Sequence, residues 1–210
     1  MIAILLSAGV GERTRGQGPC PLFSIGEKTL LDYQIESLKP LKCDVLTVLG
    51  FSSNKVFAKV QSDFYYIENE QFDTTTSAES LRLALKETDE NEVLVIDGNC
   101  LFNRRTIKLD YSESFVLYGK RKKGKLSITH NDYLENISYG LMNSWNGISF
   151  FKGEVLAALR QRLEEKRGLL LYEYINSICN RNIRAYEREV LEINNFRKQR
   201  YEILDFIKNR

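Results

Sequence analysis

The chain has 210 residues, of which 43% are hydrophobic and 28% are charged. That is enough for one α/β domain with a substantial core, and it leaves little room for two. Thirty basic and 28 acidic side chains nearly cancel to a formal net charge of +2, so overall charge does not favour nucleic acid or a membrane. We therefore expect one domain over residues 1–210 that binds neither.

The cysteines and the N-terminus exclude further classes. Four cysteines lie far apart, at positions 20, 43, 100 and 179, with no CxxC pair, and the chain has one histidine. This spacing predicts neither a zinc site nor a disulfide framework. The first residues, MIAILLSAG, are apolar but lack the basic start and cleavage site of a signal peptide. No apolar run approaches the length of a membrane span, so we expect a cytoplasmic protein.

The first half of the chain alternates predicted strands and helices. Residues 2–7 form a continuous apolar run that ends near glycine, which is typical of a central parallel strand. Leu30, Leu31, Ile35 and Leu38 recur at helical spacing before Pro40. Strand, helix, strand, helix and strand then follow over residues 44–50, 54–61, 64–69, 77–87 and 92–97, with Ser77 as the expected N-cap of its helix. This alternation predicts a parallel sheet covered by helices.

The second half has a different pattern. Strand-forming residues alternate with turn residues over 114–151, which predicts antiparallel strands. The basic cluster GKRKKGK at 119–125 is assigned to a solvated hairpin tip rather than a polyanion site. The last elements are helix, helix, strand and helix, over residues 153–168, 169–181, 182–190 and 194–209. Asn194 or Asn195 is the expected cap of the final helix.

A glycine-rich loop follows the first strand. It carries four glycines and two arginines, Gly9, Gly11, Gly16, Gly18, Arg13 and Arg15. Glycine lets backbone N–H groups approach a triphosphate closely, and arginine adds charge-assisted hydrogen bonds. In open α/β sheets, ligands bind beyond the carboxyl ends of the strands. The spacing matches neither the dinucleotide fingerprint nor a Walker loop, so an ordinary strand-to-helix turn stays open beside a phosphate-binding loop.

Five segments resemble the nucleotidyltransferase family with a GT-A-like fold. LLSAGVGER (5–13) and GPCPLFSIGEKTLLDYQIESLK (18–39) are similar to the family's L-x-A-G-x-G-x-R, P-K-x-L and L-L-x-Y-Q-I-x-x-L signatures. VLVIDGNCLF (93–102), NGISFF (146–151) and EINNFRKQRYEIL (192–204) are similar to the phosphocholine and sugar-phosphate cytidylyltransferase branch. The resemblance covers essentially the whole chain. It implies a three-layer, Rossmann-like α/β fold with a mixed, mainly parallel sheet and a small antiparallel excursion.

The resemblance also implies an activity. A phosphate or phosphonate oxygen of a small acceptor attacks the α-phosphorus of an NTP, with CTP favoured, and pyrophosphate leaves. The implied nucleotide-binding residues are Ala8, Gly9, Gly11, Arg13 and Arg15. Arg13 and Lys28 are the implied charged groups at the reacting phosphates, and Asp97 is the implied ligand of a Mg²⁺ cofactor. A shift of the alignment places Asn99 at the metal position instead.

Two positions depart from the family pattern. Cys20 stands where the family has the P-K lysine, and Asn194 stands where it has its second metal-binding aspartate. Loss of one oriented cation in a phosphoryl-transfer site costs about 3–5 kcal/mol of transition-state stabilisation. The alternative to an active transferase is therefore a degenerate relative that binds a nucleotide or a protein without turnover. The oligomeric state stays open, with a homodimer among the options.

Overall fold

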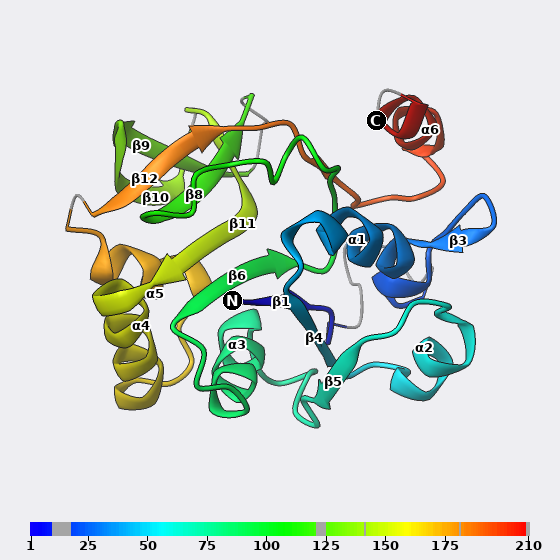
Figure 1. Cartoon of the computed structure of the whole chain (residues 1–210), viewed down its shortest axis with the longest axis horizontal. Coiled ribbons are helices and arrows are strands. Elements are labelled where there is room, and N and C mark those ends of the chain that lie inside the picture. The colour runs from blue at the N-terminus through cyan, green and yellow to red at the C-terminus, as the bar shows by residue number, and fades with distance from the viewer. Residues whose placement is uncertain (10–17, 121–124, 141, 181, 209–210) are drawn as a thin grey trace.

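A mixed sheet forms the centre of the molecule (Figure 1). The computed structural model describes residues 1–9, 18–120, 125–140, 142–180 and 182–208. Within these residues the sheet has nine strands, which in order across it are β5 (Tyr65–Glu68), β4 (Asp44–Leu49), β1 (Ile2–Leu6), β6 (Glu92–Asp97), β11 (Ser144–Lys152), β8 (Ser114–Gly119), β12 (Ile183–Glu187), β10 (Tyr133–Tyr139) and β9 (Leu126–Asn131). Two short ladders lie outside it, β2 (Ser24–Ile25) with β3 (Lys28–Thr29) and β7 (Cys100–Leu101) with β13 (Leu191–Glu192).

The strands from β5 to β6 are parallel, and the expected central strand is β1. Alternate residues of β1 enter opposite cores, Ile2 and Ile4 on one face and Ala3 and Leu5 on the other. This explains the continuous apolar run, because a strand covered on both faces has no solvent side. Beyond β6 the sheet is mainly antiparallel, starting with the β6–β11 pair. The predicted fold class is confirmed.

Helices cover both faces of the sheet and make three layers (Figure 1). On one face lie α3 (Ser77–Lys86), α4 (Gly153–Glu165) and α5 (Leu171–Ile178), and on the other lie α1 (Leu30–Leu38) and α2 (Ser53–Lys59). Leu156, Leu159 and Leu163 form the buried stripe of α4. Burial of each such side chain contributes about 1.5–3 kcal/mol. In the described ranges, no helix is both long and apolar enough to cross a bilayer.

The C-terminal helix α6 (Arg200–Lys208) packs outside these layers. Its Ile203 and Phe206 contact the cluster that contains Phe23 and Ile25, beside the short 3₁₀ helix η2 (Cys20–Leu22). The helix α6 therefore lies against the segment that follows the glycine-rich loop.

Three local predictions are wrong. The N-cap of α3 is Thr76, whose hydroxyl accepts from the Ala78 N–H at 3.3 Å, and Ser77 is already helical. The helix α6 begins at Arg200 rather than after residue 194, and Asn195 Oδ1 accepts from the Lys198 N–H at 3.1 Å in the turn that precedes the helix. The flanking strands β8 and β9 do not form the expected hairpin, because β8 pairs with β11 and β12, and β9 pairs with β10 and β11; residues 121–124 of the basic cluster lie outside the described residues.

Candidate functional site

A cavity of about 580 Å³ opens at the carboxyl ends of β1 and β6, and we name it the strand-end cavity. Its lining comes mainly from residues 7–9 after β1, residues 97–99 after β6, and the segment from Asn69 to Ser80 that includes the start of α3. Backbone N–H groups at a helix start favour anions. The cavity therefore lies where ligands of open α/β sheets bind.

The floor of this cavity depends on a close approach of two backbones. A Cβ on Gly98 would lie 2.4 Å from Ser7 Oγ and 2.6 Å from the Leu6 carbonyl oxygen. The Gly98 N–H donates to that same carbonyl at 2.9 Å. Only glycine allows this close contact, which keeps the carboxyl ends of β1 and β6 next to each other at the cavity.

A buried glutamine of α1 holds the turn after β6. Gln34 Nε2 donates to the carbonyl oxygens of Gly98 at 3.3 Å and Cys100 at 2.8 Å. One turn later on the same helix, Ser37 Oγ donates to the Phe102 carbonyl at 3.1 Å. The helix that carries the DYQIESL pattern thus fixes the backbone that presents Asp97 and Asn99.

The opposite side of the cavity is organised by Asn69, which is 2% exposed. Its Nδ2 donates to Thr75 Oγ1 and Ser80 Oγ, both at 3.1 Å, and its Oδ1 accepts from the Gln71 N–H at 3.0 Å. These bonds tie the segment before α3 to the first turns of the helix. The cavity wall is therefore held by side-chain hydrogen bonds as well as by packing.

Asp97 lines the strand-end cavity at the end of β6 and is half-buried. Its carboxylate packs over Gly147 of β11, whose φ is +76°, and a Cβ there would lie 2.6 Å from Asp97 Oδ2. The absence of a side chain at position 147 therefore makes room for the carboxylate.

Four polar side chains meet where β7 pairs with β13, and we name them the Lys125 network. Lys125 Nζ lies 2.5 Å from Glu192 Oε1 and 3.3 Å from Asn194 Oδ1. Asn99 Nδ2 donates to the same Glu192 Oε1 at 3.4 Å. One carboxylate oxygen is thus shared by an ammonium and an amide that lines the strand-end cavity.

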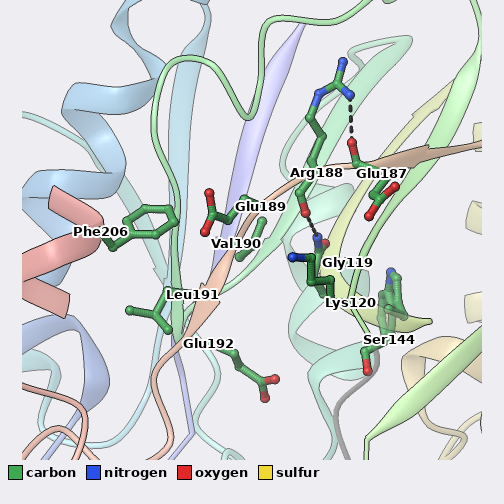
Figure 2. Close-up of a pocket in the computed structure, with 12 residues that line it drawn as sticks. Gly119, Lys120, Ser144, Glu187, Arg188, Glu189, Val190, Leu191, Glu192 and Phe206 are labelled. Atoms are coloured by element: carbon green, nitrogen blue, oxygen red, sulfur yellow. Dashed lines mark hydrogen bonds between the residues drawn. The ribbon is translucent and has the colours of Figure 1, made fainter. Parts of the chain in front are cut away.

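A second cavity, of about 410 Å³, has Glu192 of this network in its lining (Figure 2). Its lining includes Glu187, Glu189 and Glu192 as acidic groups and Lys120 and Arg188 as basic groups. Other walls are apolar, formed in part by Trp145, Val190, Leu191 and Phe206. Since Glu192 lines this cavity and its partner Asn99 lines the strand-end cavity, the two cavities have a wall in common.

A family model described as the MobA-like NTP transferase domain matches residues 3–107, which is half of the chain. The chain belongs to this family. The match spans β1, α1 and β6, and so includes residues 7–9 and 97–99 at the strand-end cavity. This family is one of NTP transferases, so the family that the resemblance predicted is confirmed.

Individual relatives agree with this family. The bifunctional protein GlmU of Buchnera aphidicola subsp. Acyrthosiphon pisum is 26% identical over 188 residues, which cover 79% of the chain. The chain spans 40% of that relative's length.

Solved structures show the same fold at low sequence identity. The CTP:phosphocholine cytidylyltransferase LicC from Streptococcus pneumoniae aligns with a TM-score of 0.78 and 20% identity over 97% of this chain and 98% of its own. The inositol-1-phosphate CTP transferase from T. maritima gives 0.76 and 18% over 99% and 96%. A putative glucose-1-phosphate thymidylyltransferase from Bacillus anthracis gives 0.79 and 15% over 98% and 95%.

The structure brings several of the predicted residues of this NTP transferase domain to one place. Ala8, Gly9, Cys20, Asp97 and Asn99 all line the strand-end cavity. The cavity thus holds both alternatives for the metal position. The roles of all these residues stay predictions.

Other predicted residues lie elsewhere. Lys28 lies outside the lining of the strand-end cavity and pairs with Glu36 at 2.5 Å, and this hydrogen bond raises the pKa of the lysine. Asn194 contacts the Lys125 network rather than that cavity. Three predicted residues lie outside the described ranges, namely Gly11, Arg13 and Arg15.

Sequence reasoning missed three residues. Gln34 and Glu192 lie inside segments that carried the resemblance, the DYQIESL helix and the EINNFRKQRYEIL stretch, so those segments held the available signal. Lys125 belongs to the basic cluster that was assigned to a solvated tip, and no signal in the sequence joined it to a residue 67 positions away.

Nucleotidyltransferases of this family typically use a divalent metal. The described residues contain no group of three or more His, Cys, Asp or Glu side chains arranged around one point. Asp97 offers a carboxylate at the cavity, but Glu192 is already in contact with the Lys125 ammonium. Hard cations prefer anionic oxygen. The donors of the described residues therefore do not fit a divalent cation that is shared by two carboxylates.

Proposed function

We propose that the chain transfers a nucleotidyl group, with cytidylyl first among the candidates, from an NTP to a small phosphorylated or phosphonylated acceptor. The observation that carries this proposal is the pair of cavities with a common wall at Asn99 and Glu192. A transfer between two bound substrates needs two adjacent compartments whose reacting groups meet at their boundary.

In this proposal the strand-end cavity holds the nucleotide. Residues 8–18 supply backbone N–H groups, and Arg13 and Arg15 supply cationic donors to the triphosphate. The start of α3, at Ser77, also lines this cavity, and the N-terminus of a helix favours anionic oxygens. Mg²⁺ would arrive with the triphosphate, and Asp97 is the side chain that we propose to hold it.

The second cavity holds the acceptor. Its charged lining comprises three glutamates against one lysine and one arginine, an excess of one negative charge. Trp145 adds an aromatic wall, and aromatic faces attract cations. Both features favour an acceptor with a cationic end, so phosphocholine and aminoethylphosphonate are tested before sugar 1-phosphates.

The reaction is one of positioning. An oxygen of the acceptor phosphate forms a bond to the α-phosphorus, the bond from that phosphorus to the β-phosphate bridge breaks, and pyrophosphate leaves with the electron pair. Correct orientation of two bound reactants contributes up to about 7–11 kcal/mol to such a step.

We also propose that the protein works in the cytoplasm. In the described part of the chain, the cysteines at positions 20, 43, 100 and 179 are not joined by disulfides. Disulfides are rare in a reducing compartment such as the cytoplasm, so this arrangement supports the proposal.

The proposal is tested by pyrophosphate release. The natural protein is incubated with CTP, UTP, ATP or GTP and each acceptor in turn, and we expect CTP with a cationic phospho-acceptor to give the fastest release. Asp97→Asn serves as the matched variant with lowered turnover. Failure of every NTP to bind in calorimetry would overturn the proposal.

A second candidate is nucleotide binding without turnover. It is favoured by Cys20, which lines the strand-end cavity where the family pattern has a lysine. Binding of CTP without pyrophosphate release from any acceptor supports this candidate. In that case Cys20→Lys should raise the release rate, because a fixed ammonium would stabilise the charge on the leaving phosphates.

A further inference from the structure

The Lys125 network has the form of a cation-binding site in which the bound cation is the ammonium of a lysine side chain. The ammonium of Lys125 contacts a carboxylate oxygen of Glu192 and the amide oxygen of Asn194, at 2.5 and 3.3 Å. Both Lys125 and Glu192 are largely buried, with side chains 24% and 15% exposed. Oxygen atoms of this kind are also the ligands that a divalent cation takes from proteins.

The two oxygens match the charge of an ammonium rather than that of a metal. A lysine carries one positive charge, which the Glu192 carboxylate balances, and the neutral Asn194 oxygen accepts a second N–H. An aspartate at position 194 would place two negative charges on one ammonium. A divalent cation would instead favour two carboxylates.

We propose that the Lys125 ammonium replaces a metal ion that residues 192 and 194 would otherwise bind at the wall between the two cavities. The neutral side chain of Asn194 is what allows a lysine to take the place of the metal. Asn194 is then not a metal-binding aspartate that has lost its function. It is the neutral hydrogen-bond acceptor that lets the Lys125 ammonium pair with Glu192 alone.

The Lys125 network includes residues that line both cavities, so its ammonium lies near any substrate bound at their boundary. Glu192 lines the second cavity, and Asn99, bonded to the same carboxylate oxygen, lines the strand-end cavity. An ammonium has three N–H donors, and the network accounts for two of those on Lys125. Lys125 itself lines neither cavity, so the third can bind only a phosphate oxygen that reaches the boundary between them, a step that rests on the proposed function.

The first test measures metal binding without any nucleotide. Mn²⁺ alone is titrated, with electron paramagnetic resonance detection, into the natural protein, Lys125→Met, Asn194→Asp and the double variant. We expect the double variant, with Glu192 and a new carboxylate both released from lysine, to bind Mn²⁺ about ten-fold or more tighter than the natural protein. Equal affinity of the two overturns the proposal.

The chain offers a matched control. Lys152 also contacts one glutamate and one neutral oxygen, Glu92 Oε1 at 2.9 Å and the Tyr111 carbonyl at 3.2 Å, away from both cavities. Lys152→Met should leave Mn²⁺ binding unchanged. Thermal melts of all variants establish that each is folded before its binding is compared.

The second test measures CTP affinity by calorimetry in EDTA. We expect Lys125→Met to weaken CTP about ten-fold, because one charge-assisted hydrogen bond is lost, while Lys152→Met has no effect. Equal losses in both variants would show that Lys125 has no contact with the nucleotide and would overturn that step. If the natural protein binds no NTP at all but the Mn²⁺ result holds, the proposed function fails and the exchange of metal for lysine stands.

Discussion

At the residue scale, Gly98 is where the site depends most directly on a missing side chain. Its Cβ would meet the Leu6 carbonyl at 2.6 Å, and backbone cannot rotate away as a side chain can. We expect Gly98→Ala to lower the free energy of unfolding by about 1–3 kcal/mol, the usual cost of overpacking. Urea unfolding measures this. Gly140→Ala is the control, since its Cβ would meet nothing closer than 3.6 Å, and equal losses in the two variants would contradict the interpretation.

Asp32 gives a prediction about pH. Burial raises the pKa of its carboxyl, but hydrogen bonds from Thr29 and Ser62 lower it more, so the folded value lies below the ordinary 3.8. The carboxylate closes the capping box of α1 and accepts from the Gln61 and Ser62 N–H groups, both at 2.9 Å. A lowered pKa stabilises the fold above the unfolded value, and this contribution is lost as pH falls through the folded value.

We therefore expect Asp32→Asn to cost about 1–3 kcal/mol of unfolding free energy at pH 7. The difference from the natural protein should shrink as the pH falls below about 4. Denaturant unfolding at several pH values measures it. Asp63→Asn, at an exposed position near the same segment, should be neutral throughout. A difference that stayed constant down to pH 2 would mean that the charge of Asp32 has no role.

At the element scale, Arg160 joins α4 to the end of α3. Its guanidinium donates to the carbonyl oxygens of Leu85, Thr88 and Glu90, the last two at 2.9 and 3.2 Å. Carbonyls at a helix end have no partner within the helix. We expect Arg160→Met to lower the free energy of unfolding by about 1.5–3 kcal/mol, as measured by denaturant unfolding.

The control for this prediction lies two residues away. Arg162 is exposed and pairs only across the surface of its own helix, with Glu165 at 3.1 Å. Exposed pairs of this kind contribute little, so Arg162→Met should change stability by less than about 0.5 kcal/mol. Similar effects in both variants would show that the contacts of Arg160 with α3 do not stabilise the fold.

The positions of strands and helices were predictable from the sequence where burial of their side chains leaves a clear apolar pattern. The runs that became β1, β4 and β6 are apolar because helices cover both faces of the sheet, and α4 shows its buried stripe at helical spacing. Element ends were less predictable. Thr76 and Ser77 both suit an N-cap, and the choice follows from the Thr76 hydroxyl, which also donates to the distant Leu169 carbonyl at 2.9 Å.

The candidate site was predictable in its place but not in its contacts. Gly9 and Asp97 each follow a strand of the parallel half, so their presence at one edge of the sheet follows from topology. Lys125 and Glu192 are 67 positions apart; Lys125 directly precedes β9 of the large sheet, whereas Glu192 lies in β13, which pairs with β7 outside it. Such strand pairing is set by the whole core, and local sequence around a basic cluster does not contain it.

At the scale of the whole molecule, the N-terminal and C-terminal parts of the chain come together at the candidate site. The helix α6 packs on the segment after the glycine-rich loop, and its Phe206 forms one wall of the second cavity (Figure 2). The N-terminal parallel half contributes the strand-end cavity, and the later strands and C-terminal residues contribute much of the second one. Two substrates would thus be bound by different parts of one chain, at the same time.

This arrangement predicts that a substitution in one cavity changes the KM of one substrate and leaves the KM of the other nearly unchanged. Ser77→Leu places a branched side chain at the exposed start of α3 in the strand-end cavity, and it should raise KM for the NTP about ten-fold with little change for the acceptor. Phe206→Ala removes an apolar wall of the second cavity, and it should raise KM for the acceptor about five-fold with little change for the NTP. Initial-rate measurements with both substrates varied should also give intersecting lines, because the proposed transfer passes directly from the NTP to the acceptor without a covalent enzyme intermediate. Parallel lines, or a rise of both KM values in either variant, would contradict two cavities that act as separate compartments of one site.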